Sequence, residues 1–432
     1  MVSAKTRYIF LILICCIVYV MSYFYRASPT ILSLDLMRDF SLNAANLGVF
    51  SSATMLAYGI MQLPSGMLAD IFGARNTLFA LTLSAAIGTI WFAHTHSLET
   101  VFASRFTVGL GLAVTVPIAA LLARWSPAAS FARVISSVYA TGGVGGILAA
   151  PPLTFLSNAY GWRATMLGFG IFSLALAALV FAFIKDSPGD NLNRSRSKPD
   201  MRGLFSGLAN IARTRSFWYV CLWFMFTVGA NFCMATLWWG PYFMQGCGMS
   251  KISASYVLTW SSLGIVVGGP LLGYMSDVVI GRRKPLLLAC SVLSILALFC
   301  LAVFGRDLHI AIVCIATAIF CACTGASGAL AFTLAKETFS PLLTGTAIGL
   351  MNMTFPIWSA VLQFMYGNFY TWHTGLYNNP EKAHSMALVL LGVNCLVGMF
   401  FLLPFKETTS QRPVSEEQQM LYQKQAEQKE RE

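Results

Sequence analysis

The sequence contains little charge. Only 10% of its 432 residues are Asp, Glu, Lys or Arg, whereas 57% are hydrophobic and the mean hydropathy is +0.68. Soluble domains carry about 25% charged residues, so this composition excludes an ordinary soluble protein and indicates a chain with many membrane spans. The net charge of +11 does not call for a nucleic-acid partner, because the basic residues are spread over short links between apolar runs.

The sequence also lacks the residue clusters that carry chemistry. None of its 11 cysteines stands in a C-x-x-C spacing beside a histidine, and no His, Asp, Glu or Cys constellation suits a metal or a nucleophile. We therefore expect no metal, no cofactor and no enzymatic activity. A membrane sensor or a multi-pass membrane enzyme remains an alternative of another class, which the short tail and the missing constellation disfavour.

Twelve apolar runs are each long enough to cross about 30 Å of hydrocarbon, which takes about 20 residues. They cover residues 8–34, 45–65, 77–95, 100–122, 132–156, 163–184, 216–242, 252–274, 285–304, 308–332, 343–368 and 384–405. The fold class expected is therefore an all-α membrane protein. Its predicted parts are a six-helix unit (1–184), a polar linker (185–215), a second six-helix unit (216–405) and a tail (406–432).

The basic residues predict an orientation. Most of the 28 lysines and arginines fall before the first run, in the even-numbered links, in the linker and in the tail. Basic residues accumulate on the cytoplasmic side of membrane proteins, so we expect both termini in the cytoplasm. The compact links favour a bacterial inner membrane, where we expect a monomer in the lipid bilayer.

One charged loop signature occurs twice, about half a chain apart. Residues 66–75 read GMLADIFGAR, and residues 273–284 read GYMSDVVIGRRK. Each copy lies between two apolar runs and places an acid near a base between glycines, which suits a charge latch at a tight turn. The latch residues predicted are Asp70, Arg75, Asp277, Arg282 and Arg283. The repeat indicates a duplicated unit, which is typical of transporters.

These loops resemble the signature loop of the major facilitator superfamily, G-x-L-x-D-R-x-G-R-[KR]. The first copy departs at Ile71 and Ala74, and the second carries an extra residue before Gly281. Residues 105–111, RFTVGLG, and the glycine-rich segment 142–146 resemble that superfamily's fourth and fifth helices. The resemblance implies two pseudo-symmetric six-helix bundles around a central cavity that opens alternately to each side.

Within that superfamily, Arg26 and the segment 62–70, QLPSGMLAD, look most like organic-anion and sugar-phosphate permeases, including anion:cation symporters. Proton-coupled members of that group tend to carry acids where this chain has Tyr25 and Leu112. The missing acids favour facilitated diffusion, exchange, or coupling through the ionisation of the substrate itself. Asp35 and Glu337 are the alternative proton carriers.

Arg26 and Arg105 are the charged residues that we expect inside the spans, and intramembrane charges mark functional sites. Arg26 shares one helical face with three further substrate-site candidates, which are Tyr19, Tyr23 and Thr30. A guanidinium among phenols suits bidentate binding of a carboxylate or phosphate. Alternatively, Arg26 extends toward lipid headgroups. For Arg105 the resemblance implies packing within its own half and assistance in coupling.

Further cavity candidates follow from helix faces. They are Tyr139, Asn231, Trp238, Trp260, Asn352 and Gln363. The sequence thus predicts a secondary transporter for a small anionic or zwitterionic organic metabolite. A carrier for neutral solutes, amino acids or small peptides is the alternative.

Overall fold

The structure is a computed structural model that describes residues 4–187, 210–338 and 341–407. Within these ranges, all twelve predicted membrane spans are confirmed. They are Thr6–Asp39, Ala44–Ile71, Ala74–Ala93, Leu98–Trp125, Arg133–Tyr160, Trp162–Phe183, Arg215–Gly246, Lys251–Ile280, Arg283–Phe304, Ile310–Leu334, Thr346–Tyr377 and Pro380–Leu402. Most of the predicted linker and tail lies outside the described residues.

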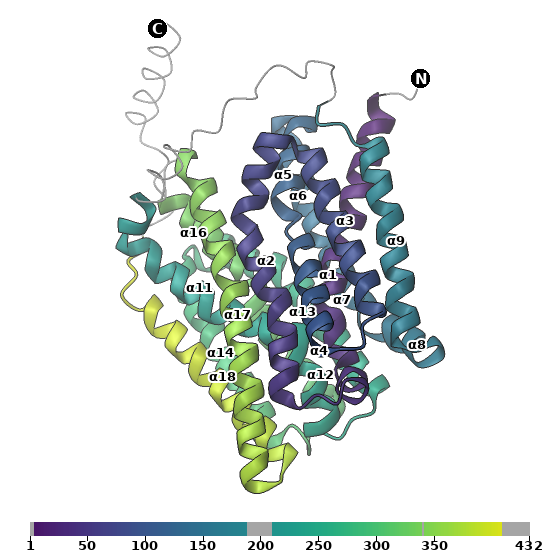
Figure 1. Ribbon diagram of the computed structural model, residues 1–432. Coiled ribbons are helices and arrows are strands. Elements are labelled where there is room, and N and C mark those ends of the chain that lie inside the picture. Colours follow the sequence, from purple (N-terminus) through teal and green to yellow (C-terminus); the bar gives the residue numbers. More distant parts are fainter. Residues whose placement is uncertain (1–3, 188–209, 339–340, 408–432) are drawn as a thin grey trace, which may run out of the picture.

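The first six spans form one bundle (Figure 1). Its helices are α1 (Ala4–Asp39), α2 (Ala44–Phe72), α3 (Ala74–Ala93), α4 (Leu98–Gly111), α5 (Thr115–Trp125), α6 (Ala128–Ala140), α7 (Gly142–Leu148), α8 (Pro151–Tyr160) and α9 (Trp162–Phe183). The fifth span is divided into α6, α7 and α8, because its glycines are weak helix formers and Pro151 has no N–H for the helical ladder.

The second bundle repeats this plan with more π-helical turns. Its elements are α11 (Arg215–Cys233), η1 (Met234–Trp238), α12 (Trp239–Pro241), η2 (Tyr242–Gly246), α13 (Lys251–Tyr274), η3 (Met275–Ile280), α14 (Arg283–Phe304), α15 (Ile310–Cys321), η4 (Ala322–Ala326), α16 (Gly328–Thr338), α17 (Pro341–Tyr377) and α18 (Pro380–Leu402). Such π turns inside helices are frequent at functional sites.

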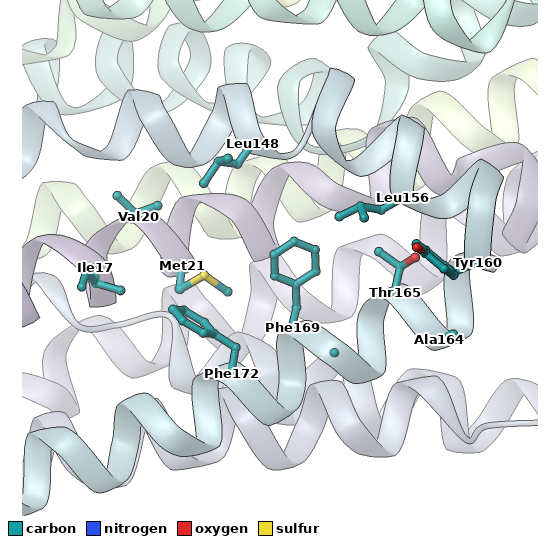
Figure 2. A pocket seen from close by; sticks show the side chains of 11 residues that line it. Ile17, Val20, Met21, Leu148, Leu156, Tyr160, Ala164, Thr165, Phe169 and Phe172 are labelled. Atoms are coloured by element: carbon teal, nitrogen blue, oxygen red, sulfur yellow. The ribbon is translucent and has the colours of Figure 1, made fainter.

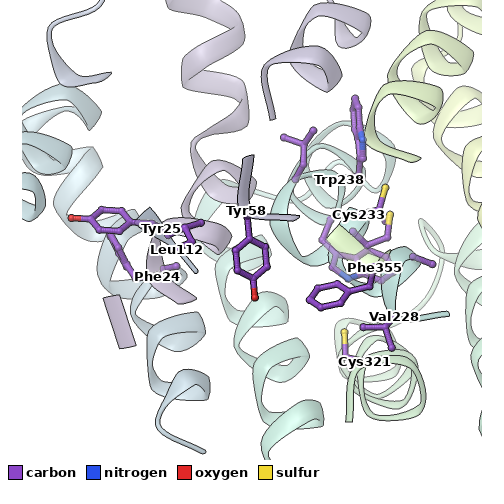
Figure 3. Packing of buried hydrophobic residues seen from close by; sticks show 14 of the residues in the cluster. Phe24, Tyr25, Tyr58, Leu112, Val228, Cys233, Trp238, Cys321 and Phe355 are labelled. Carbon is purple, nitrogen blue, oxygen red and sulfur yellow. The ribbon is translucent and has the colours of Figure 1, made fainter. Parts of the chain in front are cut away.

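We call the face of the molecule where α1 begins and α18 ends the terminal face, and the other the opposite face. The two bundles meet along α2 and α17, which pack over much of their length. Close packing is possible because small residues stand at this seam: a Cβ at Gly59 would lie 2.7 Å from the Ile357 side chain. Figure 3 shows Tyr58 of α2 and Phe355 of α17 nearby, with ring centroids 6.2 Å apart.

Polar contacts join the two bundles near the opposite face. The ammonium of Lys251, at the start of α13, lies 2.5 Å from a carboxylate oxygen of Asp35 on α1 and 3.0 Å from the Ser157 hydroxyl on α8. The hydroxyl of Thr30 donates to the carbonyl of Ala235 at 2.9 Å. These bonds hold the bundles together on this side of the membrane.

Candidate functional site

Arg26 lies in the middle of α1 with only 3% of its surface exposed. Its Nε donates to the Ser22 carbonyl at 3.1 Å, Nη2 to the Ser22 hydroxyl at 3.0 Å and Nη1 to the Tyr58 hydroxyl at 3.2 Å. The guanidinium carbon also lies 4.0 Å from the centre of the Tyr23 ring and 6.0 Å from that of Phe232. No carboxylate pairs with Arg26 among the described residues, so its buried charge is stabilised by neutral partners alone.

Arg26 lines a cavity between the two bundles. The lining residues are Tyr23, Arg26, Ala27, Thr30, Gly146, Ala149, Ala150, Asn231, Phe232, Ala235, Thr236, Leu258, Ser261, Ser262 and Ile265. The cavity has a volume of about 60 Å³, whereas ligand pockets measure about 300–1,000 Å³. An organic acid therefore enters only when the lining helices move apart.

Four of the predicted substrate residues line this cavity together. They are Tyr23, Arg26, Thr30 and Asn231. Tyr19 and Tyr139 stand behind Tyr23: the Tyr19 ring stacks on Tyr139 at 5.1 Å and packs against Tyr23 at 5.2 Å. The Tyr139 hydroxyl donates to the Thr115 carbonyl. These two tyrosines support the cavity wall and do not form its surface.

On the second bundle, a buried hydrogen-bond chain leads away from the cavity. The side-chain Nε2 of Gln363 donates to the hydroxyl of Thr236 at 2.7 Å, and its Oε1 has no hydrogen-bond partner within the described part of the chain. The Trp238 indole donates to the main-chain carbonyl of Gln363, and its ring stacks on that of Tyr366 with the centroids 4.4 Å apart. Trp238 and Gln363 thus stand one layer behind the lining, and Thr236, which the sequence reading missed, is the group that reaches the cavity.

The structure places Trp260 away from the cavity. Its side chain is 48% exposed and shares an exposed stripe of α13 with Tyr256, Val267 and Leu271. Ser261 and Ser262, the next two residues of the same helix, line the cavity instead. The helix rotates 100° per residue, so Ser261 and Ser262 point in other directions than Trp260.

Two other candidates also lie outside the cavity lining. Asn352 of α17 is partly buried. Arg105 of α4 is 1% exposed, donates to the Tyr25 carbonyl at 3.3 Å and lies over the rings of Phe50 and Phe92. Arg105 therefore packs inside the first bundle, as the resemblance implied.

Both copies of the repeated loop form tight turns. Gly73 joins α2 directly to α3 with a φ of +89°, and Gly281 follows η3 with a φ of +67°. L-residues with a Cβ rarely adopt this backbone conformation. The glycines at these two positions therefore allow each helix pair to turn back within a few residues.

The charged latch residues do not bridge one another in the first copy. Asp70 is exposed and makes no ion pair or hydrogen bond within the described part of the chain. Arg75 instead donates to the carbonyl of Phe181 at the end of α9. In the second copy Asp277 pairs with Arg283 at 3.6 Å, and Arg282 is exposed.

Two acids that the sequence reading missed hold these loops. Asp186, which follows α9, accepts from the backbone N–H of Arg75 at 2.9 Å and lies 3.7 Å from Arg124. Glu407, which follows α18, accepts from the backbone N–H groups of Arg283 and Lys284. Each acid thus caps the helix after a repeated loop, where the helix dipole favours negative charge. Asp186 and Glu407 occupy equivalent positions, each after the sixth span of its half. This match is the feature of the sequence that could have indicated a shared role for the two acids.

One buried imidazole lies apart from the cavity. His384 is fully buried in the first turns of α18, near the opposite face. Its Nδ1 lies 3.0 Å from the Tyr366 hydroxyl, and its Nε2 has no hydrogen-bond partner among the residues that the structure describes. His384 is not among the residues that line the cavity.

A larger hollow of about 740 Å³ lies on the first bundle between α1, α7, α8 and α9 (Figure 2). Its lining is almost entirely hydrocarbon, with Phe169 and Phe172 prominent, and Tyr160 and Thr165 as polar members at one end. A charged substrate would lose its hydration there without gaining a charged partner. This hollow therefore does not qualify as an anion site.

Comparison with known proteins agrees with this architecture. The family model of the Major Facilitator Superfamily matches residues 12–362 and 230–427. The chain therefore belongs to the major facilitator superfamily, whose fold consists of two six-helix bundles.

Among curated proteins, the probable sulfoacetate transporter SauU of Cupriavidus necator is 25% identical over 92% of this chain and 94% of its own length. The probable galactarate/D-glucarate transporter GudP of Bacillus subtilis is 24% identical over 91% of this chain and 90% of its own length. Among solved structures, a bacterial homologue of the human lysosomal transporter Spinster, in an inward-facing conformation, superposes with a TM-score of 0.75 at 17% identity. That superposition covers 92% of this chain and 96% of the homologue.

Proposed function

We propose that this chain is a secondary transporter that moves a small organic anion or zwitterion across the membrane by alternating access. The observation that carries the proposal is Arg26, a buried cation at a cavity between the two bundles that has no acidic partner among the described residues. A buried charge is unfavourable unless it is paired, so an anionic substrate completes the site. The names of the curated relatives, which are transporters of organic acids, support the same class.

Alternating access accounts for the contacts between the bundles. The clasp formed by Lys251, Asp35 and Ser157 closes the opposite face. For the substrate to enter from that face, the clasp opens while the terminal face closes. We assign this second closure to rearranged contacts of the repeated loops, with Arg105 holding the first bundle rigid. The loop residues are Asp70, Arg75, Asp277, Arg282 and Arg283.

The cavity lining also indicates whether transport is coupled to protons. Its lining contains no carboxylate and no imidazole, and proton symport needs a titrating group that faces the substrate path. We therefore favour exchange or facilitated diffusion of the anion over ordinary proton symport.

The same proposal includes the placement of the chain. Residues 1–184 and 216–405 form the two transport bundles, joined by a cytoplasmic linker at 185–215 and followed by a cytoplasmic tail at 406–432. The protein acts as a monomer in a bacterial inner membrane, with both termini in the cytoplasm. Its partners are a small-molecule substrate and the lipid bilayer.

The test is the exchange of Arg26. We expect Arg26→Ala to abolish uptake of organic anions into proteoliposomes, and Arg26→Lys to recover little, because lysine lacks the planar fork for bidentate binding. Arg7→Ala, which removes an exposed cation from the same helix, should transport as the unmodified protein does. Normal uptake by Arg26→Ala, or uptake of neutral solutes alone, would reject the anion site and favour a carrier of neutral solutes.

A further inference from the structure

The two bundles contribute different chemistry to the cavity. The first bundle supplies the cation Arg26, the ring of Tyr23 and the hydroxyl of Thr30. The second bundle supplies neutral polar groups from Asn231, Thr236, Ser261 and Ser262. The charge on the cavity wall thus comes from the first bundle, and the second-bundle side, which we call the neutral end, offers hydrogen bonds without charge.

Arg26 has room for one oxyanion. A guanidinium carries five N–H donors, and three of those of Arg26 are used by Ser22 and Tyr58. The remaining two are one N–H on each terminal nitrogen, and these two donors are available to a single carboxylate or sulfonate. A second anionic group on the same substrate would need another cation, and the lining offers none.

The neutral end has hydrogen-bonding capacity to spare. Among the described residues, the hydroxyl of Ser261 has one hydrogen-bond partner, the sulfur of Cys321 at 3.1 Å, and that of Ser262 makes a long bond of 3.4 Å to the Leu258 carbonyl. Sulfur is a weak hydrogen-bond partner, so both hydroxyls can exchange their contacts for a substrate group at low cost. Asn231 accepts from Thr324 through its Oδ1 at 3.2 Å, which leaves its NH₂ group as a donor.

We propose that the substrate carries a single anionic group, bound by Arg26, and uncharged hydroxyl groups at its other end, bound by Asn231, Ser261 and Ser262. This rests on the proposed function and specifies the substrate class of the same site. A second carboxylate at the neutral end would lose its hydration without a counter-ion, which is strongly unfavourable. Substrates with one charge are therefore selected over otherwise similar substrates with two.

The test uses six-carbon compounds that differ in charge. Binding of glucuronate, glucarate and glucose to the purified protein is measured by thermal stabilisation. We expect glucuronate, with one carboxylate, to bind at least about tenfold more tightly than glucarate, with two, and glucose to show no binding. Equal or tighter binding of glucarate would overturn the inference, and so would the absence of binding by glucuronate.

The variant Ser261→Ala/Ser262→Ala tests the neutral end. We expect it to weaken binding of glucuronate by about three- to tenfold, the value of lost hydrogen bonds to neutral groups. Binding of hexanoate, which has one carboxylate and no hydroxyl, should be unchanged, which also shows that the variant folds. Unchanged binding of glucuronate would contradict the assignment of these serines.

Arg26→Ala separates this inference from the proposed function. If glucarate and glucuronate bind equally well to the unmodified protein and both are lost in Arg26→Ala, the anion site stands and the single-charge inference fails. If Arg26→Ala binds both as the unmodified protein does, the proposed function fails as well.

Discussion

At the scale of single residues, Arg26 shows how a charge is kept inside a membrane protein. Removing an ion from water costs several kcal/mol after relaxation of the protein. Three hydrogen bonds and the ring of Tyr23 at 4.0 Å offset part of this cost. A cation stabilised by neutral partners keeps its charge uncompensated for a ligand, whereas the charge of an arginine that is paired with an acid is already balanced.

Gly145 provides a residue-scale prediction. A Cβ at this position would lie 2.2 Å from the carbonyl oxygen of Val20, a clash between helix backbones, whereas a Cβ at Gly168 would meet nothing within 4 Å. We expect Gly145→Ala to lower the free energy of unfolding by about 1–3 kcal/mol, as overpacking does, and to slow transport. Gly168→Ala is the matched control and should keep both properties, as measured by thermal unfolding and uptake. Equal behaviour of the two variants would show that α1 and α7 can separate freely.

The sequence identifies a site residue well when its amino-acid type is unusual for its surroundings. It identifies a site residue less well when the role depends on the direction in which the side chain points from its helix. Arg26 could be selected because a charge within an apolar run is rare and has few explanations. Trp260 could not be separated from Ser261 and Ser262, since neighbouring positions on a helix point in different directions and α13 has a polar cavity face beside an exposed aromatic stripe.

At the scale of elements, the helix pairs are held by acids from distant parts of the chain. Asp186 caps α3 and Glu407 caps α14, each across more than a hundred residues of sequence. The twelve spans could be predicted because hydrophobic length alone defines them. The caps were harder to predict, because the matching positions of Asp186 and Glu407 in the two halves do not say which turn each carboxylate reaches.

Substitutions of three acidic residues at the terminal face distinguish a role as a helix cap from a role as a charge latch. We expect Asp186→Ala to lower the free energy of unfolding by about 1–2 kcal/mol, the usual value of a lost helix cap, and Glu407→Ala to do the same in the second bundle. Asp70→Asn should leave thermal stability unchanged, because Asp70 is exposed and has no ion pair among the described residues. It should nevertheless slow transport, because the latch is lost.

Thermal unfolding and uptake measured on the same preparations decide between the roles. If Asp70→Asn transports at the normal rate, Asp70 serves orientation in the membrane and the latch assignment is wrong. If Asp186→Ala and Glu407→Ala keep full stability, the carboxylates do not act as caps.

At the scale of the whole molecule, the two bundles are connected near the opposite face, and alternating access requires that this connection breaks. The backbone N–H of Ala45, at the start of α2, donates to the hydroxyl of Thr371 on α17 at 3.1 Å. We expect the variant Ala45→Cys/Thr371→Cys to form a disulfide under mild oxidation and to lose uptake almost completely, because the bundles can no longer separate there. A reductant should restore uptake. Each single cysteine variant is a control for the native thiols and should transport before and after oxidation. Full uptake by the cross-linked protein would mean that the bundles do not separate at the opposite face during transport. The substrate would then cross without alternating access, and the proposed mechanism would be wrong.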